Sequence, residues 1–215
     1  MDASVYPTVP ALTELFPDHG LRRGAIYELS PQHTLLWALI AQMTQLGHFV
    51  GLVGLQHLGL RSAQDLGVDL ERLVIISDPR GAWWDATNTL VDALSLVALR
   101  PGGTVPSAHQ RDRFQARLRE RGATLLLSGR WPGADASVSV EQSRWEGIEA
   151  GAGVLQRQHL TLAHRSRRDV DTRRIALTVS ADGIQPEREQ RDHYVVTSLP
   201  ERADVAPMTH HRQAG

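Results

Sequence analysis

The chain has 215 residues, a formal net charge of −1 and no cysteine, and 41% of its residues are hydrophobic. This length and composition are typical of one globular domain with short tails. The absence of cysteine excludes disulfides, thiolate–zinc sites and cysteine nucleophiles. Every Lys/Arg position is arginine, so a phosphate-binding or catalytic lysine is excluded as well.

The sequence contains no signal for a membrane or for export. No apolar stretch reaches the ~20 uncharged residues of a membrane span. The first residues carry neither the basic nor the apolar region of a signal peptide. We therefore expect a cytoplasmic protein with no membrane contact.

Residues 1–19 form the predicted N-terminal arm, and Leu12, Leu15 and Phe16 are expected to dock on the chain's own domain. The domain begins at Gly20 with a turn, a strand over 25–29 and a tight corner at 30–32. A helix follows over 34–46, because its apolar residues recur at helical spacing. Thr34 is its N-cap or lies in its first turn.

Strands and helices then alternate along the chain. Further buried strands are predicted over 48–55, 73–76, 94–99 and 124–127. Helices are predicted after Ser62 as an N-cap, over 81–92, and over 107–121, where Phe114 and Leu118 form the buried stripe. This alternation indicates an α/β fold with a mostly parallel sheet flanked by helices.

The pattern changes after residue 133. Residues 136–148, 159–165 and 173–180 alternate between apolar and polar residues without a helix between them. They predict an antiparallel C-terminal extension at the edge of the sheet. The domain is therefore expected over 20–183, followed by a flexible C-terminal tail over 184–215, which is rich in charged residues.

The corner after the first strand stands where a phosphate-binding loop, G-x-x-x-x-G-K-[ST], would lie. It consists of Ser30, Pro31, Gln32, His33 and Thr34, without glycine or lysine. Proline also removes one backbone donor. We interpret it as a degenerate nucleotide site that binds no nucleotide. Anion binding at the helix start is the alternative.

The strongest positively charged stretch is 156–174. Its candidate DNA-binding residues are Arg157, Arg165, Arg167, Arg168, Arg173 and Arg174. Arginine side chains on a hairpin suit phosphate oxygens and need not read bases. The alternative is a solvated hairpin with local Arg–Asp pairs. Few aromatic residues lie between the arginines, so base stacking is not predicted.

Two further features are candidates for partner contact. Adjacent helical residues cannot both face the core, so Trp83 or Trp84 is expected to be partly exposed, as interface anchors often are. The alternative is that one ring packs inward and the other lies along a loop. Trp131 and Trp145 are expected in the core. In the tail, Tyr194, Val195 and Val196 could anchor a partner, or the tail is inert.

No catalytic constellation is recognisable in the sequence. Histidines are scattered, no His/Asp/Glu cluster has metal-ligand spacing, and no G-x-S-x-G elbow is present. We predict no enzyme activity, no catalytic residue, no metal site and no cofactor.

The order of these segments resembles the RecA ATPase core over about residues 20–180. Residues 20–29 resemble the turn and strand before the RecA P-loop, 67–73 resemble the turn before a later strand, and 119–127 resemble a helix and strand of the later core. Three ATPase parts are missing: the P-loop glycine and lysine, an acidic residue at Gln56 and His57, and a magnesium-binding aspartate where Arg100 stands. Without them nothing neutralises a transferring phosphoryl group.

A narrower resemblance is to the ATPase-deficient ImuA-type proteins of actinobacteria. Residues 20–24, 67–73 and above all Gly129–Asp135, Gly-Arg-Trp-Pro-Gly-Ala-Asp, carry it. The resemblance implies a non-catalytic accessory protein of the SOS mutasome in error-prone translesion synthesis. Its implied partners are an ImuB-like inactive Y-family polymerase homologue, an error-prone C-family replicative polymerase, and DNA. Nucleoid association after DNA damage would follow.

Two other functions remain open. A SulA-like cell-division inhibitor would share a RecA-like fold without a P-loop and bind a tubulin-like division protein. A divergent RecA-family ATPase would use non-standard residues.

Overall fold

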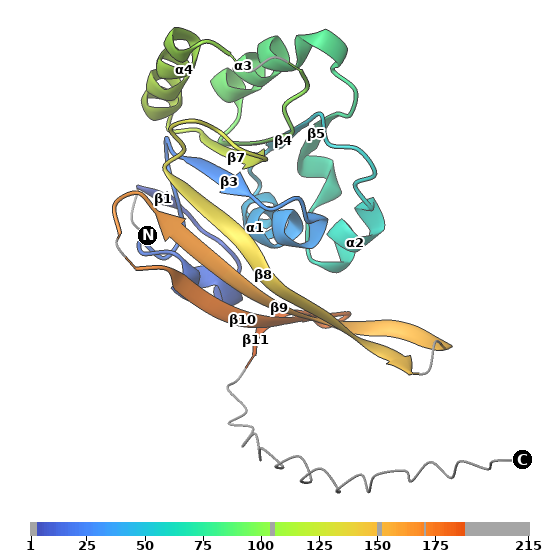
Figure 1. The fold of residues 1–215 in the computed structure, drawn as a ribbon. Coiled ribbons are helices and arrows are strands. Elements are labelled where there is room, and N and C mark those ends of the chain that lie inside the picture. Colours follow the sequence, from blue (N-terminus) through green and yellow to red (C-terminus); the bar gives the residue numbers. More distant parts are fainter. Residues whose placement is uncertain (1–3, 104–105, 150–151, 170, 188–215) are drawn as a thin grey trace, which may run out of the picture.

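The computed structural model describes residues 4–103, 106–149, 152–169 and 171–187. Nine strands form one mixed sheet in the order β11-β10-β9-β8-β3-β7-β6-β4-β5 (Figure 1). Its strands are β3 (Ile26–Leu29), β4 (Val50–Val53), β5 (Leu73–Ile76), β6 (Leu96–Leu99), β7 (Thr124–Ser128), β8 (Ala136–Glu149), β9 (Ala152–Ser166), β10 (Arg173–Ser180) and β11 (Gly183–Pro186). Strands β1 (Val5–Tyr6) and β2 (Leu21–Arg22) pair separately and antiparallel.

The predicted division into a parallel and an antiparallel part is confirmed. Pairs β3·β7, β7·β6, β6·β4 and β4·β5 are all parallel. Strand β8 joins the two parts, because it pairs parallel with β3 and antiparallel with β9. Pairs β9·β10 and β10·β11 are antiparallel. The sequence did not predict β11, which extends the described sheet to Pro186, into the segment interpreted as tail.

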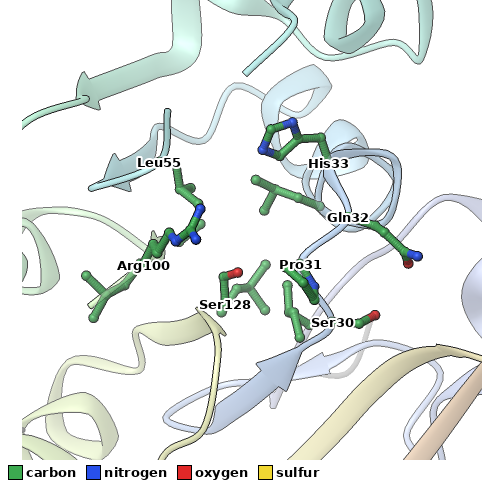
Figure 2. Close-up of a pocket in the computed structure, with 12 residues that line it drawn as sticks. Ser30, Pro31, Gln32, His33, Leu55, Arg100 and Ser128 are labelled. Carbon is green, nitrogen blue, oxygen red and sulfur yellow. The ribbon is translucent and has the colours of Figure 1, made fainter. Parts of the chain in front are cut away.

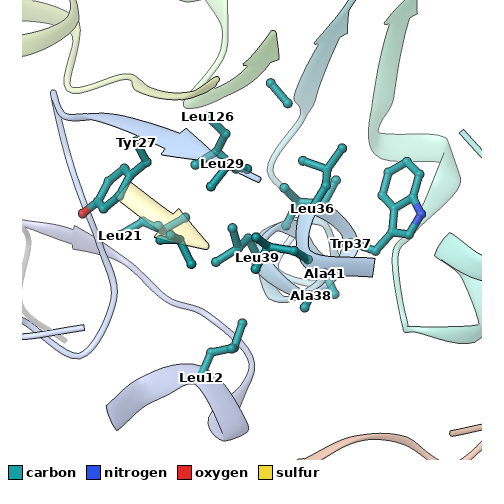
Figure 3. Close-up of a cluster of buried hydrophobic side chains, with 14 of the residues drawn as sticks. Leu12, Leu21, Tyr27, Leu29, Leu36, Trp37, Ala38, Leu39, Ala41 and Leu126 are labelled. Carbon is teal, nitrogen blue, oxygen red and sulfur yellow. The ribbon is translucent and has the colours of Figure 1, made fainter. Parts of the chain in front are cut away.

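The helices divide between the two faces of the sheet. The α-helices are α1 (His33–Gln45), α2 (Leu60–Asp65), α3 (Trp83–Ala93) and α4 (Ala108–Arg121), and the short 3-10 helices are η1 (Pro10–Leu15), η2 (Leu70–Arg72) and η3 (Arg80–Ala82). Side chains of η1, α1 and α2 form one apolar cluster with one sheet face (Figure 3). Side chains of α3 and α4 form a second cluster on the other face.

Helix α1 is the most deeply buried helix of the first cluster, with nine of its residues buried. Leu12, Leu15 and Phe16 are also buried there, so the predicted docking of the N-terminal arm is confirmed. Thr34 lies in the first turn of α1, whose N-cap is Gln32.

The helix predicted over 107–121 is confirmed as α4, whereas the N-cap predicted for α2 is wrong. Ser107 caps α4 in a reciprocal capping box with Gln110, and Phe114 and Leu118 are buried as predicted. The interpretation of Ser62 as an N-cap was wrong, because α2 already begins at Leu60. Gly24 has a positive φ of 73° and faces α4, where a Cβ atom would lie 2.8 Å from the Cα of Arg119. This close approach explains the glycine at that turn.

No helix among the described residues is both long and apolar enough to span a bilayer. The predicted tail lies outside the described residues from position 188 onward, together with the candidate anchors Tyr194, Val195 and Val196.

Candidate functional site

The corner between β3 and α1 uses its polar groups to hold the antiparallel part of the sheet. The backbone N–H of Ser30 donates to the carbonyl of Val138 at 3.1 Å. The Ser30 hydroxyl accepts a hydrogen bond from the backbone N–H of Val140 at 2.9 Å. The Thr34 hydroxyl donates to Oε1 of Gln158 at 3.1 Å. Both hydroxyls therefore connect the corner to β8 and β9.

A small, mostly apolar cavity lies beside this corner, at the carboxyl ends of the parallel strands (Figure 2). Its volume is about 30 Å³, whereas small-molecule sites measure roughly 300–1,000 Å³. The lining residues are Leu29, Ser30, Pro31, Gln32, His33, Leu36, Leu55, Ala98, Leu99, Arg100, Leu126 and Ser128, which include no carboxylate. The cavity offers neither the space nor the acidic ligands of a magnesium-nucleotide site.

The segment Gly129–Asp135 connects β7 to β8, the two parallel neighbours of β3, without a helix. Trp131 anchors its middle: the side chain is 4% exposed and packs against Trp84 and Phe114. Asp135 anchors its end by accepting hydrogen bonds from the backbone N–H of Ile26 at 3.0 Å and from Nε2 of Gln115 at 3.1 Å. The segment is thus fixed across the α3–α4 face of β3.

Glu28 of β3 lies beneath this segment. Its carboxylate accepts a hydrogen bond from the backbone N–H of Trp131 at 2.5 Å. The Arg130 side chain lies 3.7 Å from the same carboxylate and is 95% exposed. Glu28 therefore holds the segment and brings one arginine to the surface beside it.

Strand pairing places further residues of β8 and β9 in line with Glu28, and together they form a groove. Glu28 is opposite Ser137 of β8, and Ser137 is opposite Arg165 of β9. With Arg130 and Arg167 these residues line an open hollow of about 350 Å³, which we call the arginine groove. Three arginines meet one glutamate there, so the groove is positively charged. Arg165 and Arg167 form no ion pair with any described residue.

A second hollow, of about 130 Å³, adjoins the groove and has the opposite charge balance. It contains Arg22 and Arg168 but also three aspartates, Asp18, Asp135 and Asp169. His164 and Tyr27 line it as well. Burial lowers the pKa of His164 and raises the pKa of Tyr27 to about 12. This acidic hollow is unsuited to a polyanion.

The six arginines predicted as a DNA-binding set are all exposed, but they do not form one patch. Arg165 and Arg167 line the arginine groove, whereas Arg168 lines the acidic hollow. Arg174 is bonded through two nitrogens to Glu141, at 2.8 and 3.1 Å. Arg173 pairs with His164 across the strands and lines neither hollow. Arg157 lies on β9 about 26 Å from Arg165 at the usual rise per residue.

The prediction that one tryptophan of the adjacent pair is partly exposed is confirmed, but Trp83 is the buried one and is not available as a partner anchor. Its ring is 4% exposed and belongs to the α3–α4 cluster. Trp84 is the partly exposed member of the pair, and its ring stacks beside Trp131 at a centroid distance of 6.1 Å. Trp131 is in the core as predicted, but Trp145 is 49% exposed because it lies on the part of β8 that extends beyond β3.

Sequence reasoning assigned no role to Glu28 or Arg130. Both lie in segments that carried the family resemblance, at 20–29 and 129–135, and that was the signal that could have found them. Among the described residues, no three His, Asp or Glu side chains are grouped to hold a metal ion.

Fold and site together define an α/β protein with a mostly parallel sheet. The corner Ser30–Thr34 after β3 has its hydroxyls bonded within the protein and only a small cavity beside it, and we call it the filled corner. The arginine groove lies nearby. A model of the MT3502 N-terminal domain family matches residues 14–133, more than half of the chain, and the chain belongs to this family. The uncharacterized protein Rv3395c of Mycobacterium tuberculosis (strain ATCC 25618 / H37Rv) is 32% identical over 136 residues, which cover 63% of this chain and 67% of the relative. A mycobacterial relative agrees with the actinobacterial resemblance.

Proposed function

We propose that the chain is a RecA-like, ImuA-type adaptor without ATPase activity that serves error-prone translesion synthesis after DNA damage. Its partner is an ImuB-like inactive Y-family polymerase homologue, which connects it directly or indirectly to an error-prone C-family polymerase. The place of action is the cytoplasm, at the nucleoid once DNA is damaged.

The filled corner carries this proposal. In an ATPase of this architecture the corner would surround phosphate groups with backbone N–H donors and a lysine. Here Pro31 contributes no N–H, and the Ser30 and Thr34 hydroxyls bond to β8 and β9. Arg100 follows β6 in place of a magnesium-binding carboxylate. A protein that keeps this frame without its phosphate chemistry is suited to binding partners.

The architecture also supports the proposal. Five parallel strands connected by helices, followed by antiparallel strands at one edge, correspond to the segment order on which the RecA resemblance rests. The family match covers three of the four segments that carried the RecA and ImuA resemblance, and most of the fourth.

Co-purification from DNA-damaged cells, with full-length protein as bait, tests the proposal. We expect the polymerase homologue among the captured proteins. Capture of a tubulin-like division protein, with inhibition of its polymerisation and no polymerase homologue, would show a SulA-like function instead.

A second bait that ends after Glu187 locates the contact. This end point retains β11, and it keeps Glu187, which donates its N–H to Ala176 and contacts His159. We expect loss of the polymerase homologue if the tail binds it. Retention would place the contact on the domain, where Trp84 is partly exposed.

Nucleotide turnover is the complementary measurement. We expect no ATP hydrolysis above background. Protein-dependent hydrolysis that a Thr34→Ala variant abolishes would establish the divergent ATPase and contradict the adaptor.

A further inference from the structure

The arginine groove combines cations from two segments that are distant in sequence. Arg130 comes from the β7–β8 connection, Arg165 lies near the end of β9, and Arg167 follows that strand directly. The connection is held at Trp131 and Asp135, and the backbone N–H of Arg167 donates to the carbonyl of Asp135 at 3.0 Å. The cations therefore stand on a fixed frame, which reduces the ordering cost of binding.

The charges in the groove are available to a ligand. Arg165 and Arg167 have exposed side chains and no ion pair within the described part of the chain. Arg130 shares the Glu28 carboxylate with the Trp131 N–H and is 95% exposed. The groove carries one acid against three arginines, and that acid is already bonded. An incoming anion would therefore meet more positive than negative charge.

We propose that the arginine groove, lined by Arg130, Arg165 and Arg167, is a sequence-independent binding site for the phosphodiester backbone of nucleic acid.

The chemistry of the groove favours phosphates. Guanidinium groups bind phosphate oxygens through paired hydrogen bonds, and several arginines along an open hollow suit a repeating polyanion. The one aromatic residue in the lining, Trp131, is buried and cannot stack on bases. The groove therefore contacts the backbone and leaves the bases unread. Arg157 and Arg174 do not line this groove, and Arg168 lines the acidic hollow instead.

The proposal deepens the adaptor function by naming the ligand of one surface. Fluorescence anisotropy of the full chain with a labelled oligothymidylate and with a labelled duplex tests it and distinguishes single-stranded from double-stranded backbone. The test variant is Arg130→Ala/Arg165→Ala/Arg167→Ala. The control variant is Arg61→Ala/Arg72→Ala/Arg174→Ala, which removes the same charge from arginines paired with Asp65, Asp69 and Glu141.

We expect the groove variant to bind at least ~10-fold more weakly, as loss of charge-assisted hydrogen bonds predicts. The slope of log affinity against log salt concentration should also become shallower by about two on single strands, because three phosphate contacts are lost. The control variant should bind within about twofold of the native chain, since its arginines are already paired.

Equal losses in both variants would overturn the proposal, because affinity would then follow net charge alone. Binding to neither oligonucleotide would overturn it as well. So would binding only to polyglutamate, a polyanion without phosphate groups that serves as a further probe. Thermal melting of both variants checks the fold. If the groove variant loses DNA but still captures the polymerase homologue, the groove and the adaptor are both supported. If DNA binding depends on the groove and no polymerase homologue is captured, the groove stands and the adaptor fails.

Discussion

Strand β3 borders two polar regions, the filled corner and the arginine groove, which differ in volume, lining and charge. At its carboxyl end, the corner from Ser30 to Gln32 adjoins a cavity of about 30 Å³ with a mostly apolar lining. One residue before that end, Glu28 forms the floor of an open groove of about 350 Å³ with three arginines. The corner is where an α/β fold of this kind usually binds its ligand.

The difference follows from what the neighbouring strands do with their polar groups. At the corner the Ser30 hydroxyl is bonded within the protein, to the edge of β8. At the end of β9, Arg165 and Arg167 form no ion pair with any carboxylate among the described residues. A fold can therefore keep its frame while its charged surface lies elsewhere, and the following predictions test this contrast.

The largest effect on stability is expected at Trp131, which anchors the segment Gly129–Asp135 beside the arginine groove. Trp131→Ala removes a buried ring from the α3–α4 cluster and should lower the free energy of unfolding by about 3–5 kcal/mol. Urea unfolding measures it. Trp145→Ala is the matched control, since that ring is 49% exposed, and its effect should stay within about 0.5 kcal/mol. Similar losses in the two variants would contradict the anchoring role.

A pH effect is expected on the face opposite the groove. Burial lowers the pKa of His164 in the folded state, so below pH ~6.5 the unfolded chain binds more protons. Stability should fall as the pH drops from 7.5 to 5.5, by at most about 1.4 kcal/mol per pH unit for one proton. The charged groups around it are Asp18, Arg22, Asp135, Arg168, Asp169 and Arg173.

Urea unfolding of His164→Gln at both pH values isolates this contribution. The slope with pH should flatten whatever the absolute stability of the variant. His109→Gln, on the exposed face of α4, should keep the native slope. A native slope in the His164 variant would assign the pH dependence to other groups.

A smaller effect is expected at the corner itself. Ser30→Ala leaves the backbone N–H of Val140 without its side-chain acceptor and should cost about 1 kcal/mol. Thr34→Val, which removes the hydrogen bond to Gln158, should cost a similar amount. Oligonucleotide binding by both variants should remain native. A loss of oligonucleotide binding with stability intact would return the corner to the functional surface.

The smallest effect is expected at Arg174. Its hydrogen bonds lower the pKa of Glu141, but both groups are in water, where such pairs contribute little. Arg174→Ala should leave the melting temperature nearly unchanged, and raising the salt concentration should not separate variant from native. A clear drop in melting temperature would show that this pair does more than a surface pair normally does.

The sequence predicted the local elements well, because their signals are local. Strand 73–76 was placed at its observed bounds, and helix 107–121 was predicted together with its buried Phe114 and Leu118. The absence of glycine and lysine from the corner at Ser30–Thr34 could also be recognised from the sequence alone. What failed was decided by pairing between distant segments: the row from Glu28 through Ser137 to Arg165 depends on register. The exposure of Trp145 depends on how far β8 extends beyond β3.

The connection at 129–135 has one more consequence, for where this protein can be cut. The family match ends at residue 133, two residues before Asp135, whose carboxylate accepts the backbone N–H of Ile26. A chain ending there would leave β3 as a bare edge and remove Val138, Leu160, Leu162 and Leu177 from the packing around α1. The range that the family model matches is therefore shorter than the sheet and core of this chain, and we expect a piece ending at residue 133 to be unstable on its own.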